Sequence, residues 1–509
     1  MVKTSSNIRQ DNLHSGASSE EEMYSSEERI DHSVAPALTA TQEIKLWRRI
    51  DLRLMPMITL MCLLSSMDKS VSPNVRIGNA KLDGLIAQLN LAGNKYNIAL
   101  SFLFRPFRLI PKHVPLSLVI HAIRPSKQVW LPGIMVSACL TSIEILMGFV
   151  TTYPQLVGVR ACLGVAEAWL YPGVVYYITV WYPKYMYQYQ LALLWGAGSL
   201  AGVFSGLLAC AIGFMNGDDG LQAWSWAFIF EGAATMLVGS ITAFIMVDYP
   251  STAKFLTAKE RSFVIEKKGR DDPEDEEQDV SQQVWAAFTD WQIWALSVVQ
   301  ISFAVPLYGI TYFLPSFGYS TSISQLLTVP PYALATFTVL VFAYFSDKIK
   351  LRSPFIFAAQ LITLAGYIIN ISEVPPGVKY FGTYLCVVGS YAGVPGATSW
   401  LANNLRGKYK RSIGMAVQIS VGNFGGVIGS NIFRIHDGPR YLLGFGLEIV
   451  FISVGLVAVP ITVLAYTCMN AQIDHQVLLR KRQGQTAESK EEGGALSIDS
   501  RASGFRYTL

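Results

Sequence analysis

Charged residues are scarce in this chain. They make up 15% of its 509 residues, whereas hydrophobic residues make up 51% and the mean hydropathy is +0.34. Soluble domains average about a quarter charged residues. The composition therefore excludes an ordinary soluble protein and indicates a membrane protein with several spans. The formal net charge of +4 is small, and no stretch forms a basic patch for nucleic acid.

Paired cysteines and catalytic motifs are missing as well. The six cysteines lie singly in apolar segments without a CxxC pair, which argues against disulfides and against a metal site. The sequence contains no Walker loop, no nucleophile elbow and no HExxH motif. We therefore expect neither an enzyme nor an ATP-driven pump, and we expect no metal and no cofactor. The segment 1–49 is polar, so no cleavable signal peptide is expected.

Long apolar runs dominate the rest of the chain. Runs of about 17–25 residues recur, which is the length that a helix needs to cross a bilayer. We predict an all-α integral membrane fold, with twelve transmembrane helices in two six-helix bundles. The predicted spans are 50–67, 97–121, 130–150, 158–182, 189–213, 224–247, 290–314, 325–345, 354–371, 379–400, 411–433 and 442–469.

Polar segments divide these spans into domains. Residues 1–49 are acidic and serine-rich, and they are predicted to be a disordered cytosolic tail. An amino-terminal bundle, 50–247, is followed by a charged cytosolic loop, 248–289, and by a carboxyl-terminal bundle, 290–470. A second cytosolic tail covers 471–509. The start of the central loop, TAKFLTAKERSFVIEKK, is predicted to form a short amphipathic helix at the membrane interface.

Lysine and arginine define the orientation of the spans. They gather in short loops on one side, whereas three opposite loops, 151–157, 214–223 and 315–324, contain none. The positive-inside rule then places both termini in the cytosol. Segment 68–96 is an exception, because it carries four basic residues on the outer side. We expect a monomer in the plasma membrane.

The two halves of the chain resemble each other. Pro172-Gly173 recurs as Pro395-Gly396, and the same offset relates glycines in the following two spans: Gly202 to Gly425, Gly206 to Gly429, and Gly232 to Gly455. A parallel repeat of six-helix halves is the arrangement of major facilitator transporters.

One stretch, RACLGVAEAWLYPGVVYYITVWYP at 160–183, carries two charges inside a membrane-length helix. Arg160 and Glu167 are seven residues apart and share one helix face. Charges at this depth are costly and usually face a protein or water-lined cavity. We interpret Arg160 as an anion-binding or gating charge and Glu167 as a protonatable carboxyl group. A structural ion pair between helices is the alternative.

Further polar residues are candidates for coupling, gating and binding. Asp68 ends the first span and is a candidate for proton coupling, although a carboxylate at a helix end is the alternative. Asp347 with Arg352 is a candidate gate at an inner loop. Asn423 and Asn431 lie roughly two turns apart on one predicted helix and are candidates for binding a polar substrate. Hydrogen bonds between helices would explain these two asparagines equally well.

Several motifs together resemble a known family. RRIDLRLMP at 48–56, LGVAEAWLYPGVVYYITVWYP at 163–183 and GNFGGVIGSNIFRIHDGPRYLLGFG at 422–446 are similar to fungal members of the anion:cation symporter family of the major facilitator superfamily. That family includes allantoate, nicotinate and pantothenate permeases. The resemblance implies that the positions of Arg160 and Glu167 serve anion recognition and proton linkage.

Two features depart from that family. Trp169 stands where its members usually have glycine. Residues 103–121 do not look like the family's second helix, since Arg105, Arg108 and Lys112 would each cost roughly 2.5–3.5 kcal/mol at the bilayer centre. One hypothesis is an error in the gene model; sequencing of the transcript across residues 68–130 tests it.

The sequence thus predicts a secondary transporter that takes up a small organic anion with protons by alternating access. The resemblance implies allantoate, nicotinate or a vitamin precursor as candidate substrates. One alternative is a uniporter or an exporter of a metabolite. A non-transporting sensor or inactive paralogue is another.

Overall fold

The structure of the chain is a computed structural model. It describes residues 38–69, 143–167, 170–183, 186–212, 215, 217, 220–247, 249–271, 280–313, 321–405, 408–433, 441–488 and 506–508. Within these residues every regular element is a helix, as the sequence predicted. The predicted second span, most of the third, and Trp169 lie outside the described residues.

The amino-terminal half contributes five described helices. They are α2 (Ala40–Lys69), α8 (Tyr153–Glu167), α9 (Leu170–Trp181), α10 (Tyr187–Ile212) and α11 (Ala223–Ile245). α2 begins at Ala40 and therefore extends the predicted first span into the segment that we expected to be disordered. The predicted fourth span corresponds to two helices, α8 and α9, which are separated by residues 168 and 169.

The central loop contains more helix than the sequence suggested. A short 3-10 helix, η5 (Pro250–Thr252), precedes α12 (Ala258–Asp271), which is the predicted amphipathic helix. Thr257 and Glu260 form a capping box at its start, in which the Thr257 backbone N–H donates to the Glu260 carboxylate at 2.9 Å. α13 (Val280–Thr289) follows, and it was not expected.

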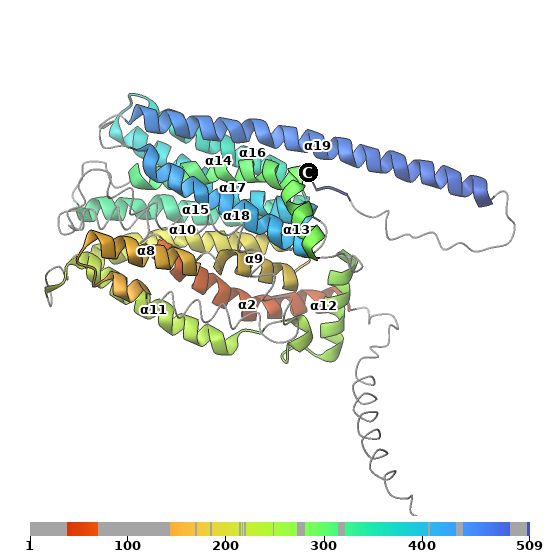
Figure 1. Cartoon of the computed structure of the whole chain (residues 1–509), viewed down its shortest axis with the longest axis horizontal. Coiled ribbons are helices and arrows are strands. Elements are labelled where there is room, and N and C mark those ends of the chain that lie inside the picture. The colour runs from red at the N-terminus through yellow and green to blue at the C-terminus, as the bar shows by residue number, and fades with distance from the viewer. Residues whose placement is uncertain are drawn as a thin grey trace, which may run out of the picture.

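The carboxyl-terminal half supplies six described helices. They are α14 (Trp291–Phe313), α15 (Thr321–Ile349), α16 (Ser353–Ile371), α17 (Pro376–Asn404), α18 (Lys408–Ile432) and α19 (Leu442–Glu488). Each of the six overlaps one predicted span. α19 continues well beyond the predicted end at residue 469 and projects out of the bundle (Figure 1).

The internal repeat is visible in the helix boundaries. The offset that relates Pro172 to Pro395 also carries the start of α8 and the end of α9 onto residues 376 and 404, which are the two ends of α17. The same shift places α10 over α18 to within three residues. The offset found from a few glycines therefore describes the helices themselves.

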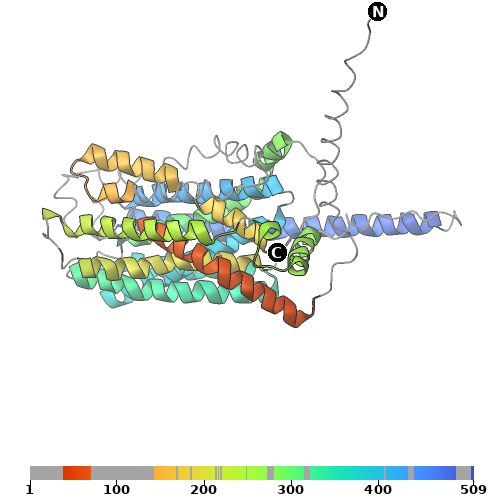
Figure 2. The same ribbon diagram turned by 90° about the horizontal axis from the view of Figure 1, so that it is seen from below.

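The helices run side by side, and α12, α13 and the projecting end of α19 lie toward one end of the bundle (Figures 1 and 2). We call this the α12 end. The two halves meet along α10 and α15. At Gly202 of α10 an added Cβ would lie 2.8 Å from the Tyr332 ring of α15. The close approach of these helices therefore depends on the small residue at this position.

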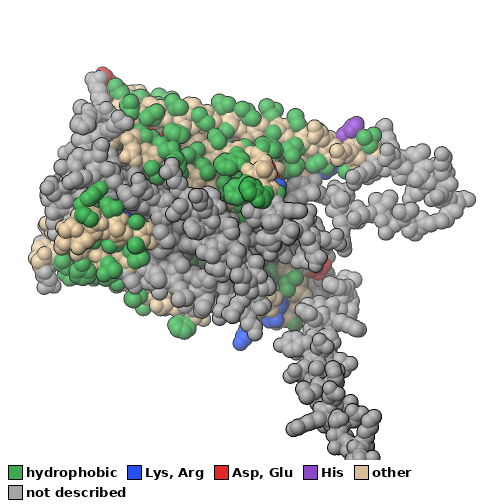
Figure 3. Space-filling view, viewed as in Figure 1, with side chains coloured by type: hydrophobic (Ala, Val, Ile, Leu, Met, Phe, Trp, Pro, Cys, Tyr) green, Lys and Arg blue, Asp and Glu red, His purple; other side chains and the backbone are tan. Residues whose placement is uncertain are grey.

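The outer surface fits a bilayer. Six described helices are long and apolar enough to cross a membrane: α2, α11, α14, α15, α16 and α19. Large apolar side chains are exposed on them, for example Phe244 at 91%, Phe337 at 66% and Leu464 at 65%. Figure 3 shows such side chains along α19. Exposed apolar surface of this extent is expected where lipid replaces water.

Candidate functional site

Arg160 lies inside the protein. It occupies the middle of α8, and its side chain is fully buried. An arginine at this depth is costly unless protein groups or a ligand compensate its charge. Glu167 is the last residue of α8, two turns further along, and Asp68 is the second-to-last residue of α2. The side chains of Glu167 and Asp68 lie outside the described part of the structure.

The two asparagines differ in their surroundings. Asn423 is half-buried on α18, and its Oδ1 lies 3.4 Å from the donating hydroxyl of Tyr308 on α14. Asn431 is exposed, and its Nδ2 donates to the Val427 carbonyl of its own helix at 2.8 Å. Both residues thus lie on α18 as predicted, and Asn423 is hydrogen-bonded to a neighbouring helix.

Asp347 and Arg352 are brought together at the α12 end. α15 ends at Ile349, and Lys350 has a φ of 61°, so the chain turns back within a few residues to start α16 at Ser353. This turn places Asp347 Oδ1 2.6 Å from Arg352 Nη1. The Arg352 side chain is 1% exposed and that of Asp347 is 14% exposed, so water screens the pair weakly.

The start of α10 completes this cluster from the other half of the chain. The Tyr189 backbone N–H donates to Asp347 Oδ2 at 2.8 Å, and Arg352 Nη1 donates to the side-chain oxygen of Gln188. Ser346 Oγ also lies 3.0 Å from that oxygen. We call Gln188, Tyr189, Ser346, Asp347 and Arg352 the latch. Two of its hydrogen bonds across the halves, from Tyr189 to Asp347 and from Arg352 to Gln188, involve a charged side chain, and such bonds are stronger than neutral ones.

Sequence reasoning found the latch only in part. Asp347 and Arg352 stand out as charges in a short loop, whereas Gln188 and Tyr189 look like ordinary residues at the start of a span. Their role follows from the packing of α10 against α15, which no local pattern reveals.

Apolar side chains close the α12 end beside the latch. Met415 and Ile419 of α18 and Ala402 of α17 belong to one buried cluster with residues of α2, α9 and α10. Ile419 is 4% exposed. The two halves are therefore packed together at this end, and access from it requires that they separate.

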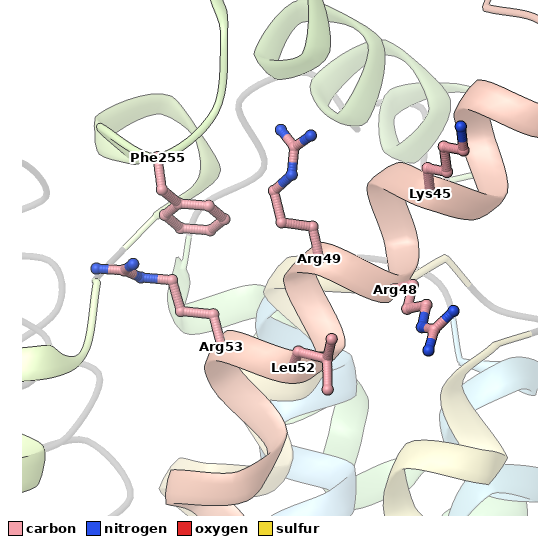
Figure 4. A pocket seen from close by; sticks show the side chains of 6 residues that line it. All are labelled: Lys45, Arg48, Arg49, Leu52, Arg53 and Phe255. Carbon is pink, nitrogen blue, oxygen red and sulfur yellow. The ribbon is translucent and has the colours of Figure 1, made fainter.

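A basic pocket of about 450 Å³ lies beside this cluster, at the start of α2 (Figure 4). It is lined by Lys45, Arg48, Arg49, Leu52, Arg53 and Phe255. Glu260 of α12 pairs with Arg49 at 3.1 Å, and the Arg53 guanidinium lies 5.0 Å from the centre of the Phe255 ring. Two of the four cations thus interact with the central loop, and the Arg49–Glu260 ion pair links α2 to α12.

Glu448 of α19 is a buried carboxyl group that the sequence pattern did not single out. It is fully buried next to Gly309 of α14 and near Tyr367 of α16 and Cys386 of α17. Among the described residues, neither carboxyl oxygen has a hydrogen-bond partner. Two further acidic side chains, Glu144 and Glu231, are also buried. Within the described part of the chain, no three acidic, histidine or cysteine side chains group as a metal site.

Known proteins resemble this chain in sequence and in fold. The sequence model of the Major Facilitator Superfamily matches residues 123–430. The chain is 30% identical to the high-affinity nicotinic acid transporter of Saccharomyces cerevisiae, over 82% of this chain and 76% of the yeast protein. It is 31% identical to the MFS-type transporter cnsO of Penicillium expansum, over 88% of this chain and 85% of that protein.

Solved transporter structures share the fold. The proton:xylose symporter XylE bound to 6-bromo-6-deoxy-D-glucose superposes with a TM-score of 0.60 at 13% identity, and the match covers 80% of this chain and 94% of XylE. A bacterial homologue of the human lysosomal transporter Spinster, inward-facing and occupied, gives a TM-score of 0.56 at 16% identity over 81% and 96% of the two chains.

Proposed function

The chain belongs to the Major Facilitator Superfamily, and we propose that this multi-pass membrane transporter takes up a small organic anion together with protons. The substrate is a carboxylate, in the class of nicotinate or allantoate. The protein works as a monomer in the plasma membrane, with both termini in the cytosol. Transport follows from alternating access, in which the two halves rock about a site between them.

The buried guanidinium of Arg160 is the observation that supports an anionic substrate. A guanidinium presents paired donors that match the two oxygens of a carboxylate. The attraction between an anion and this positive charge is stronger in the weakly screened interior than in water. The yeast relative, which is named as a nicotinic acid transporter, supports the same class of substrate.

Glu167 is proposed as the proton carrier because it shares a helix face with Arg160. A carboxyl group in a low-dielectric cavity binds a proton more readily than it does in water. Protonation of Glu167 would remove a negative charge from the neighbourhood of the anion and so favour its binding. Uptake of the anion and uptake of the proton are then linked through the electrostatics of one helix. Asp68, at the end of α2, is the second proposed coupling residue.

The latch is proposed to hold the cytosolic side closed while the substrate enters from outside. Opening toward the cytosol would break the hydrogen bonds of Gln188 and Tyr189 to α15 and to Arg352, and would separate Ile419 from α9 and α2. Substrate and proton would then leave together. Asn423, near Tyr308, is proposed to bind the polar part of the substrate, and Asn431 is retained as a weaker candidate.

A transport assay tests the proposal. Cells that express the chain are given a panel of labelled carboxylates with an acid or a neutral medium, and with or without a protonophore. We expect at least one carboxylate to accumulate in the cells, and to do so faster from the acid medium. The protonophore should abolish this accumulation. Accumulation that ignores the proton gradient would instead indicate a uniporter, and net efflux would indicate an exporter. Correct surface expression without any flux would indicate a sensor or an inactive paralogue.

A further inference from the structure

Residues 506–508 return to the bundle and lie in a notch between two helices. Figure 1 shows this segment as the short dark blue trace beside the mark C, at the α12 end of the bundle. Two helices form the notch. Trp400 and Asn404 lie near the end of α17, and the second half of α19 contributes Tyr466, Asn470 and Asp474. We call Arg506–Thr508 the tail segment.

The backbone of the tail segment is bound by two asparagine side chains. Asn470 Oδ1 accepts from the Tyr507 N–H at 2.9 Å, and Asn470 Nδ2 donates to the Tyr507 carbonyl at 3.0 Å. Asn404 makes the same pair with Thr508, at 2.7 and 3.1 Å.

This alternation has a simple geometric cause. In an extended chain, the N–H and C=O of one residue point to the same side, and those of the next residue point to the opposite side. The tail segment therefore uses one residue to bind α19 and the next to bind α17. A third donor, Trp400 Nε1, reaches the Thr508 carbonyl at 2.8 Å. An unrelated chain end would not be expected to satisfy all these groups in register.

Side chains add sequence selectivity to the backbone contacts. The Tyr507 ring stacks on Tyr466, with 5.2 Å between the ring centres and 6° between the planes. Arg506 forms an ion pair with Asp474. Tyr466 in turn packs edge-on against Trp400, and its hydroxyl lies 3.2 Å from Gln292 Oε1 of α14. The docked tyrosine thus extends an aromatic cluster that joins α14, α17 and α19.

We propose that this notch is a peptide-binding site whose ligand is the chain's own Arg-Tyr-Thr segment. Binding fastens α17 to the extension of α19 and so organises the α12 end of the carboxyl-terminal half. This binding is reversible, because the tail segment can leave the notch without the unfolding of any helix. Since the ligand is tethered, a free peptide competes only at high concentration, on the order of millimolar. Binding of the tail segment to the notch requires neither the transported substrate nor the proton.

A labelling experiment on the full-length purified protein tests this site. Thr508→Cys introduces a thiol into the tail segment, while the backbone contacts of position 508 are kept. The rate at which maleimide modifies that thiol is followed by mass spectrometry of the tail peptide. Asn470→Ala should raise this rate at least about tenfold, because it removes both bonds to Tyr507. Gln472→Ala, at an exposed neighbour on α19, is the matched control and should not change the rate.

Peptide competition gives a second measurement with all helices unaltered. The synthetic peptide Gly-Phe-Arg-Tyr-Thr-Leu, which copies residues 504–509, should accelerate labelling at millimolar concentration. The same peptide with alanine in place of tyrosine should have no effect. The proposal is overturned if Asn470→Ala labels at the rate of Gln472→Ala, or if the tyrosine peptide has no more effect than the alanine peptide.

Discussion

Arg160 shows how a single residue constrains function in a membrane protein. Its position inside an apolar helix can be recognised in the sequence, because one charge among long apolar runs is conspicuous. Its complete burial adds that the charge lies within the protein and away from lipid. Glu448 cannot be recognised in this way, because in the sequence it is one more acidic residue near the start of a predicted span. Only the packing of α19 against α14 reveals that it is enclosed.

Substitution of Arg160 should separate charge from geometry. Arg160→Lys keeps the positive charge but loses the planar donor pair. We expect kcat/KM for the carboxylate to fall by roughly 10–100-fold, as for the loss of hydrogen bonds to a charged group. Uptake kinetics normalised to surface abundance measure this effect. Unchanged kinetics in correctly expressed protein would remove Arg160 from the binding site.

Substitution of Glu167 should affect coupling. Glu167→Gln resembles the protonated carboxyl group permanently, so we expect uptake that no longer rises as the outside pH falls, and loss of accumulation against a gradient. Exchange of labelled for unlabelled substrate should persist. Glu448→Gln, at a buried carboxyl group in the other half, is the comparison. A normal pH profile for Glu167→Gln, with a flat one for Glu448→Gln, would transfer the coupling role to Glu448.

At the scale of elements, hydropathy predicted the membrane helices well and the polar helices poorly. The cores of α10, α11 and α14–α18 agree with predicted spans because a bilayer-length apolar run has few alternatives to a helix. The polar part of α19 after residue 469 and all of α13 were not foreseen as helices. Intrinsic helix propensity and local packing decide such segments, and these are weaker signals than hydropathy.

The contact between α10 and α15 can be tested at its closest point. Gly202→Ala would place a Cβ 2.8 Å from the buried Tyr332 ring, so the helices must move apart or the ring must shift. Overpacking of this kind costs about 1–3 kcal/mol. We expect a lower Tm in detergent and slower transport. Gly158→Ala on α8, where a Cβ would meet no atom within 4 Å, should leave Tm unchanged. Equal Tm values for both variants would show that the contact tolerates a larger residue.

At the scale of the whole molecule, the latch and the apolar cluster join the two halves at one end. Both involve residues far apart in sequence: Gln188 and Arg352 are separated by 164 positions. A transporter that alternates must be able to break such contacts, so each one biases the balance between the two states. The arrangement seen here is closed at the α12 end.

Removal of one latch charge should shift that balance. Asp347→Asn deletes the ion pair with the buried Arg352 and weakens the bond from Tyr189. We expect the α12 end to open more often. A thiol introduced by Ile419→Cys, in the apolar cluster beside α9, should then react with maleimide roughly tenfold faster, which corresponds to ~1.4 kcal/mol. Glu373→Gln, in the loop between α16 and α17, serves as the control. Equal labelling in both variants would show that the ion pair does not control opening.

The sequence alone determined that this protein is an all-helical, multi-pass membrane protein with a duplicated architecture. Apolar run length and the constant offset between the two halves are local or periodic properties, and they survive without any knowledge of the contacts. The tertiary structure decided which polar residues meet: Gln188 with Arg352, Tyr308 with Asn423, and Tyr507 with the notch formed by α17 and α19. These contacts depend on how separate helices pack and on where the tail segment docks on the bundle. Lipid makes the helices nearly obligatory, whereas their mutual contacts rest on many small packing and hydrogen-bond terms.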